Sequence, residues 1–199
     1  MAAPACAAPR DVHVLAFGDS LTAGYGLPRG RGFAPQLEDA LRRNGIPAFV
    51  TDGGVSGDTA AAARARLAWT LDSLKKKPDL AIVALGGNDM LRGLSPAQTR
   101  SEMDAILAEL KRRNIRIVVA GMLAAPNLGP AYAGQFNPIF PSVARKYGAS
   151  LYPFFLTGVA GDRRLALPDG MHPNFQGIKK MVGNILPTIS RALQPSLRE

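Results

Sequence analysis

The sequence is poor in the residues that define several large classes of protein. It contains one cysteine, Cys6, which excludes an internal disulfide framework and a cysteine-rich zinc site. It contains two histidines, His13 and His172, and with no cysteine cluster these supply too few ligands for a typical zinc site. No apolar run approaches the ~20 residues that a membrane-spanning helix needs. We therefore expect no metal site and no integral membrane segment.

Acidic residues are also scarce. The chain has 15 Asp and Glu residues against 24 Lys and Arg residues, which gives a formal charge of +9. The basic residues are scattered, and their densest runs, residues 75–77 and 111–113, fall near the ends of predicted helices, where they complement the helix dipole. Charge alone does not indicate a nucleic-acid partner, so none is expected.

The length and composition suit one globular domain. The chain has 199 residues, of which 47% are hydrophobic and 20% are charged, and we predict a single domain over residues 11–199. Residues 1–10 are mostly small and carry no pattern, which is typical of a signal-peptide remnant or a disordered tail. A signal-peptide remnant would indicate a periplasmic or secreted protein. A disordered tail would instead fit a cytoplasmic protein. The oligomeric state is left open.

Short apolar runs alternate with helical patterns along the chain. The predicted strands cover residues 12–17, 48–51, 80–85, 115–120 and 149–155. The predicted helices cover residues 33–43, 59–77, 96–113 and 175–193, with an interrupted helix over 131–147 and a kink at Pro187. This alternation predicts an α/β fold with a parallel sheet and helices on both faces. Functional sites in such sheets lie at the carboxyl ends of the strands.

Two loops carry residues suited to nucleophilic catalysis. Ser20 follows the first predicted strand, where its hydroxyl could attack a substrate, although a serine there could also simply cap a helix. His172 is the better candidate for a general base, because His13 lies in the middle of a strand. Asp169 stands three residues before His172 and could hold the imidazole Nδ1–H, although the same segment could be an ordinary turn.

Two further loops are rich in glycine. Residues 53–59 lead into a helix, so their backbone N–H groups could face a ligand or could form only a tight, capped turn. Asn88 follows Gly86 and Gly87 at the end of the third strand and offers an uncharged N–H donor for an oxyanion. Alternatively, Asn88 could only stabilise a turn. No phosphate-binding glycine motif is present in these loops.

Together the four loops resemble the sequence blocks of the SGNH (GDSL-type) hydrolase superfamily. The matching segments are Gly18-Asp19-Ser20-Leu21, Ser56-Gly57-Asp58-Thr59, Gly86-Gly87-Asn88-Asp89 and Asp169-Gly170-Met171-His172-Pro173. Their order and spacing agree with that superfamily over residues 11–195. The residues within the blocks are most similar to those of the bacterial thioesterase-I, arylesterase and lysophospholipase branch.

This resemblance implies a three-layer α/β/α, flavodoxin-like fold with a five-stranded parallel sheet. By position it implies Ser20 as the nucleophile, and Ser20, Gly57 and Asn88 as the donors of the oxyanion hole. It implies His172 and Asp169 as the base and its orienting acid.

The sequence therefore predicts a serine ester hydrolase that acts on small acyl esters or thioesters, with no cofactor. A carbohydrate acetylesterase on the same scaffold is the nearest alternative. A carbohydrate acetylesterase is expected to have additional polar and aromatic residues around its pocket, where they would contact the sugar. A third hypothesis is a non-catalytic, flavodoxin-like module that binds an anion through the glycine loops.

Overall fold

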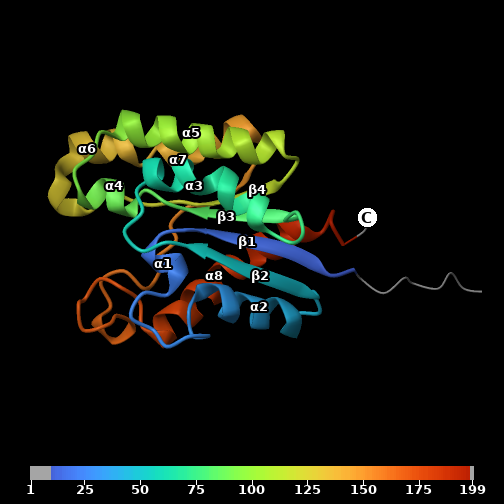
Figure 1. The fold of residues 1–199 in the computed structure, drawn as a ribbon. Coiled ribbons are helices and arrows are strands. Elements are labelled where there is room, and N and C mark those ends of the chain that lie inside the picture. The colour runs from blue at the N-terminus through green and yellow to red at the C-terminus, as the bar shows by residue number, and fades with distance from the viewer. Residues whose placement is uncertain (1–9, 198–199) are drawn as a thin grey trace, which may run out of the picture.

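A parallel sheet lies at the centre of the computed structural model, which describes residues 10–197 (Figure 1). Its strands are β1 Val12–Gly18, β2 Ala48–Gly54, β3 Leu80–Ala84, β4 Arg116–Ala120 and β5 Ser150–Tyr152. Their order is β2-β1-β3-β4-β5, and each neighbouring pair is parallel. The predicted flavodoxin-like sheet is confirmed. The prediction of a tail over residues 1–10 lies, apart from Arg10, outside the described residues.

Helices cover both faces of the sheet (Figure 1). One face carries α2 Phe33–Arg43 and α8 Phe175–Leu193. The other carries α3 Ala60–Ser73, α5 Pro96–Arg112 and α7 Ile139–Tyr147. The three-layer α/β/α architecture follows, as expected for parallel strands joined by helical crossovers. Within residues 10–197, none of the helices combines the length and the apolar character that crossing a membrane requires.

Several short helices follow the strands. They are α1 Ser20–Ala23, α4 Gly87–Leu91, α6 Gly129–Phe136 and the 3₁₀ turns Pro126–Leu128 and Arg163–Leu165. Helices α1 and α4 start two and three residues after β1 and β3 end. No helix range was predicted at α1 or α4, because helices of four or five residues are too short to show a hydrophobic period.

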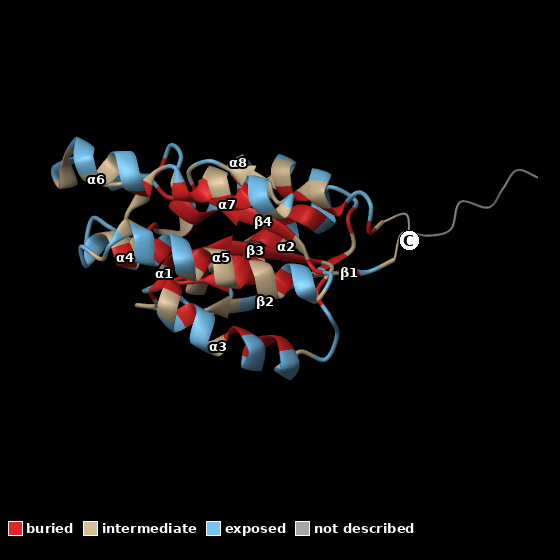
Figure 2. Ribbon diagram, turned by 90° about the horizontal axis from the view of Figure 1, so that it is seen from above, coloured by how far each residue is buried: buried red, intermediate tan, exposed pale blue. Residues whose placement is uncertain are grey.

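The core lies between the sheet and its helices (Figure 2). All five residues of β3 are buried, which its unbroken apolar sequence predicted for a strand covered on both faces. On α2, the predicted stripe of Phe33, Leu37 and Leu41 is fully buried. Burying side chains of this size contributes about 1.5–3 kcal/mol each, so this stripe fixes α2 on the sheet.

Two predicted elements end earlier in the structure than expected. Helix α3 ends at Ser73 and not at residue 77, because Leu74 turns to an extended conformation with ψ 135° and packs against the core. Strand β5 ends at Tyr152 and not at residue 155, because the regular pairing shifts by one residue at Pro153. The N–H of Gly121 donates to the Tyr152 carbonyl oxygen at 2.8 Å, but the Gly121 carbonyl oxygen accepts from Phe155, one residue beyond the regular partner, at 2.8 Å. Helix α8 spans Phe175–Leu193, the predicted range, with Pro187 inside it.

Candidate active site

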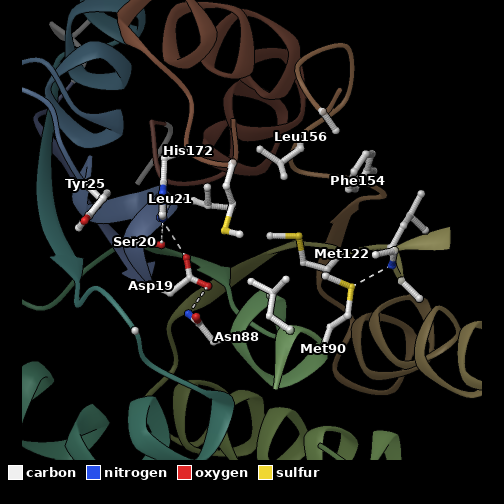
Figure 3. Close-up of a pocket in the computed structure, with 18 of the residues that line it drawn as sticks. Asp19, Ser20, Leu21, Tyr25, Asn88, Met90, Met122, Phe154, Leu156 and His172 are labelled. Atoms are coloured by element: carbon white, nitrogen blue, oxygen red, sulfur yellow. Dashed lines mark hydrogen bonds between the residues drawn. The ribbon is translucent and has the colours of Figure 1, made fainter. Parts of the chain in front are cut away.

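Ser20 lies at the carboxyl end of β1, as the first residue of α1 (Figure 3). Asp19 precedes it as the N-cap, and its Oδ1 accepts a hydrogen bond of 3.0 Å from the backbone N–H of Leu21. Gly18 allows this turn, because a Cβ there would stand 2.6 Å from the carbonyl oxygen of Ala84. Asp19 therefore caps the helix, so the capping alternative for Ser20 does not hold.

His172 faces Ser20 from the loop before α8. Its Nε2 lies 3.0 Å from Ser20 Oγ, and its Nδ1 lies 2.7 Å from Asp169 Oδ2. The other carboxylate oxygen of Asp169 accepts the backbone N–H groups of Met171 and His172, both at 2.9 Å. These hydrogen bonds lower the pKa of Asp169 to about 2, and the bond from the His172 side chain has the largest effect. Asp169 is therefore ionised at neutral pH and keeps the imidazole oriented toward Ser20.

The start of α8 holds this loop in place. Asn174 is the N-cap of α8, and its Oδ1 accepts the N–H groups of Gln176 and Gly177, both at 3.0 Å. Its Nδ2 donates back to the carbonyl oxygens of Arg164 and Ala166 at 2.9 and 3.1 Å. A single side chain thus ties the chain before the His172 loop to the helix after it.

The glycine loops bring hydrogen-bond donors to the same place. Gly57 and Asn88 line one cavity together with Ser20 and His172. Gly57 has φ +88°, a left-handed conformation that favours glycine. The Nδ2 of Asn88, in α4, donates to the carbonyl oxygen of Asp58 at 3.0 Å and more weakly to Asp19 Oδ2 at 3.4 Å. These bonds set the Asn88 amide beside the turn that carries Ser20.

The guanidinium group of Arg92 binds the loop that carries Gly57. The Nη2 of Arg92, directly after α4, donates to the carbonyl oxygen of Gly57 at 2.7 Å. This bond joins the loop after β2 to the segment after β3 and fixes the orientation of the peptide that follows Gly57.

Asp19 is a second acid of the site whose pKa is shifted, in the opposite direction to that of Asp169. It is only 2% exposed, and burial, the largest influence, raises its pKa from 3.8 to about 6. The hydrogen bond from Leu21 and the charge of His172 oppose that rise, while Asp58 and Asp89 add to it. The Asp19 carboxyl, next to Ser20 in the chain, therefore keeps its proton to a higher pH than an exposed aspartate does.

A largely apolar cavity of about 580 Å³ opens beside Ser20 and His172 (Figure 3). Its wall includes side chains from α4 and from the loops that follow β4 and β5, namely Met90, Leu91, Met122, Leu123, Phe154 and Leu156. Met90 Sδ accepts the backbone N–H of Ala125 at 3.1 Å, so α4 and the loop after β4 form one continuous wall. This volume lies within the range of small-ligand sites.

The structure thus brings together all five residues that the sequence singled out. His13 lies near the other end of β1, with its ring stacked on Phe49 at 5.4 Å. Over residues 10–197, no group of three or more His, Cys, Asp or Glu side chains is arranged to hold a metal ion.

The sequence reasoning missed Tyr25 and the apolar cavity wall, because apolar residues after β4 and β5 carry no chemical signature. The sequence signal for the cavity wall was its position, because these residues lie at or just after the predicted ends of the strands.

The chain is similar to known ester hydrolases. Residues 16–180 match the GDSL-like Lipase/Acylhydrolase family. The chain is 33% identical over 180 residues to "Esterase TesA" of Pseudomonas aeruginosa, covering 90% of this chain and 89% of that protein. It is 36% identical over 160 residues to "Arylesterase" of Vibrio mimicus, covering 80% and 79%. The crystal structure of AlinE4, an SGNH-hydrolase family esterase, superposes with a TM-score of 0.79 at 49% identity, covering 92% and 97%.

The fold, the site and these matches define a class, the carboxylic ester hydrolases. Within that class, the chain belongs to the GDSL-like lipase/acylhydrolase family, whose members are also called SGNH hydrolases. The resemblance noted from the four sequence blocks is confirmed, and the hypothesis of a non-catalytic anion-binding module is set aside.

Proposed function

We propose that the protein hydrolyses small acyl esters, including aryl esters and thioesters, through a Ser20–His172–Asp169 triad and an acyl-enzyme. One observation carries the proposal. The distances Asp169 Oδ2 to His172 Nδ1, 2.7 Å, and His172 Nε2 to Ser20 Oγ, 3.0 Å, form a continuous hydrogen-bonded chain. A nucleophile, a base within hydrogen-bond reach and an acid that orients the base are what acyl transfer requires.

In the first half-reaction, Ser20 Oγ forms a bond to the substrate carbonyl carbon while His172 Nε2 takes the hydroxyl proton. The carbonyl oxygen becomes an oxyanion, stabilised by the N–H groups of Ser20 and Gly57 and by the Asn88 amide. The bond to the leaving group then breaks, and His172 returns its proton to the departing oxygen or sulfur. The products are the acyl-enzyme on Ser20 and a free alcohol, phenol or thiol.

In the second half-reaction, a water molecule attacks the acyl-enzyme carbonyl and His172 Nε2 accepts its proton. The same donors hold the new oxyanion. Collapse breaks the bond between the acyl carbon and Ser20 Oγ, and His172 gives the proton back to Ser20. The carboxylic acid leaves, and the enzyme returns to its starting state.

The cavity favours substrates with an apolar acyl group. Its walls near Ser20 are mostly methionine, leucine and phenylalanine side chains. An apolar group transferred from water into such walls gains about 25 cal/mol per Å² buried. A carbohydrate acetylesterase would need polar groups for the sugar, and few line this cavity, so we favour esters of apolar acids over acetylated sugars.

A panel of p-nitrophenyl esters of increasing chain length, run beside an acyl-CoA assay, tests this proposal. We expect turnover of the esters, with kcat/KM rising as the acyl chain fills the cavity, and no turnover by the Ser20→Ala variant. Equal turnover by Ser20→Ala would refute the triad. A preference for acetylated xylan over every p-nitrophenyl ester would replace the substrate class with the acetylesterase alternative.

A further inference from the structure

The ring of Tyr25 lies against the imidazole of His172. The two ring centroids are 4.4 Å apart and the planes are tilted by 38°. In Figure 3, Tyr25 lies on one side of His172 and the apolar side chains Met122 and Phe154 lie on the other. The His172 side chain is only 17% exposed, whereas Tyr25 remains 52% exposed. Tyr25 therefore covers one side of the imidazole while its own far side faces solvent.

The turn that ends α1 holds Tyr25 in this position. The backbone N–H groups of Gly24 and Tyr25 both donate to the carbonyl oxygen of Ser20, each at 3.1 Å. Gly24 has φ +71°, and a Cβ there would stand 2.6 Å from the Cα of Gly32. Ser20 and Tyr25 therefore belong to one tightly packed turn, and both approach His172 from it.

We propose that Tyr25 is a positioning residue for His172, which holds the imidazole toward Ser20 and stabilises the imidazolium formed during each proton transfer. This inference rests on the proposed function, since only a general base alternates between the two charge states. The face of an aromatic ring carries a negative quadrupole that attracts a cation placed against it. The imidazolium is such a cation, and it exists only after His172 has taken a proton.

Two carboxylates also act on His172. Asp169 binds its Nδ1 from the same loop, and Asp19 lies at the start of α1, close enough for its charge to interact with that of the imidazole. Both favour the imidazolium, as does the Tyr25 ring. Tyr25 differs from them because it also restricts how the imidazole can tilt away from Ser20, so its loss should affect both the orientation and the charge of the base.

Two variants separate the ring from the rest of the side chain. Tyr25→Phe keeps the aromatic face, whereas Tyr25→Leu keeps an apolar cover of His172 but removes the quadrupole. With p-nitrophenyl acetate, we expect Tyr25→Leu to lower kcat by about 3- to 30-fold. We expect the acidic limb of its kcat/KM profile to move to lower pH by about 0.4 to 1.5 units. Tyr25→Phe should restore both quantities to nearly wild-type values.

Trp69→Leu is the matched control, because Trp69 is an aromatic residue of α3 that is 74% exposed and does not line the cavity. It should match the wild type in kcat and in the pH profile. Should Tyr25→Leu lower the melting temperature, Tyr25→Met offers another non-aromatic cover for the same measurements.

Two results would overturn the inference. One is a Tyr25→Leu variant with raised KM but unchanged kcat and unchanged acidic limb, which would make Tyr25 only a wall of the substrate cavity. The other is a Tyr25→Phe variant as impaired as Tyr25→Leu, which would assign the effect to the hydroxyl. Failure of the proposed function itself looks different: Ser20→Ala or His172→Ala would then retain activity.

Discussion

The Asn88→Ala substitution separates catalysis from stability at the proposed oxyanion hole. The Asn88 amide donates to the Asp58 carbonyl oxygen at 3.0 Å and approaches Asp19 Oδ2 at 3.4 Å. In the proposed mechanism it also donates to the oxyanion. Alanine removes all of these interactions and leaves the backbone of α4 unchanged, so two separate effects are expected.

The two effects differ greatly in size. Loss of one oxyanion donor lowers kcat by about 10²–10³, or roughly 3–4 kcal/mol of transition-state stabilisation. Loss of the bond to the Asp58 carbonyl costs about 1 kcal/mol of stability, which lowers the melting temperature by about 2–4 °C in a chain of this size. At 25 °C the variant therefore stays folded, and unfolding cannot account for the loss of kcat.

The assay is steady-state hydrolysis of p-nitrophenyl acetate, with melting temperatures measured on the same samples. Asn44→Ala is the matched control, because the Asn44 amide also donates to a backbone carbonyl oxygen, that of Ala40 at 2.8 Å, but it lies at the end of α2. It should lose similar stability and no kcat. If Asn88→Ala raises KM while kcat stays intact, Asn88 binds substrate and does not stabilise the oxyanion.

Four further outcomes are expected. A serine-directed fluorophosphonate should label Ser20 alone, and mass spectrometry that finds the adduct on another residue would move the nucleophile. Asp169→Asn should lower kcat by up to ~10⁴-fold with the fold intact, because the amide favours the wrong imidazole tautomer; near-normal activity would reduce the triad to a dyad. The kcat/KM profile should show one acidic limb, because His172 must be neutral to accept the Ser20 proton. That limb should survive His13→Gln, whereas activity should vanish in His172→Ala, and loss of the limb in the first variant would reassign the base. Burial raises the pKa of Asp19 from 3.8 to about 6, so the folded state keeps that proton to higher pH than the unfolded chain does. The free energy of unfolding should therefore fall as pH rises from about 4 to 6, by up to ~1.4 kcal/mol per pH unit, and urea titrations of Asp19→Asn should lack that contribution; an unchanged slope would contradict it.

The sequence by itself determined the architecture and the list of candidate site residues. Unbroken apolar runs such as residues 80–84 predict strands buried on both faces, and their alternation with helical periods predicts a parallel sheet. In such a sheet the carboxyl ends of the strands meet at one edge. Ser20 and Asn88 follow strands directly, so their proximity could be predicted without coordinates. Asp169 and His172 precede the last helix, and the four sequence blocks linked them to the same edge.

Boundaries depended on contacts that the local sequence does not show. Helix α3 stops at Ser73 because Leu74 leaves the helical conformation and packs against the core. The sequence of this segment alone favours a helix up to Lys77. Strand β5 stops at Tyr152 because the pairing shifts by one residue at Pro153, so that Phe155 donates to the Gly121 carbonyl oxygen. For α3, the free energy of the Leu74 contact outweighs a helix preference of a few tenths of a kcal/mol per residue.

Only the tertiary structure decided the environment of the candidate site. The 580 Å³ cavity is lined by side chains such as Met122 and Phe154, which are ordinary apolar residues until the fold turns them toward Ser20. Burial raises the pKa of Asp19, and ring contact places Tyr25 against His172. Desolvation and side-chain contact are properties of three-dimensional surroundings, assembled from segments distant in the chain. A linear pattern specifies which residues reach the edge of the sheet, but not which faces they turn toward one another.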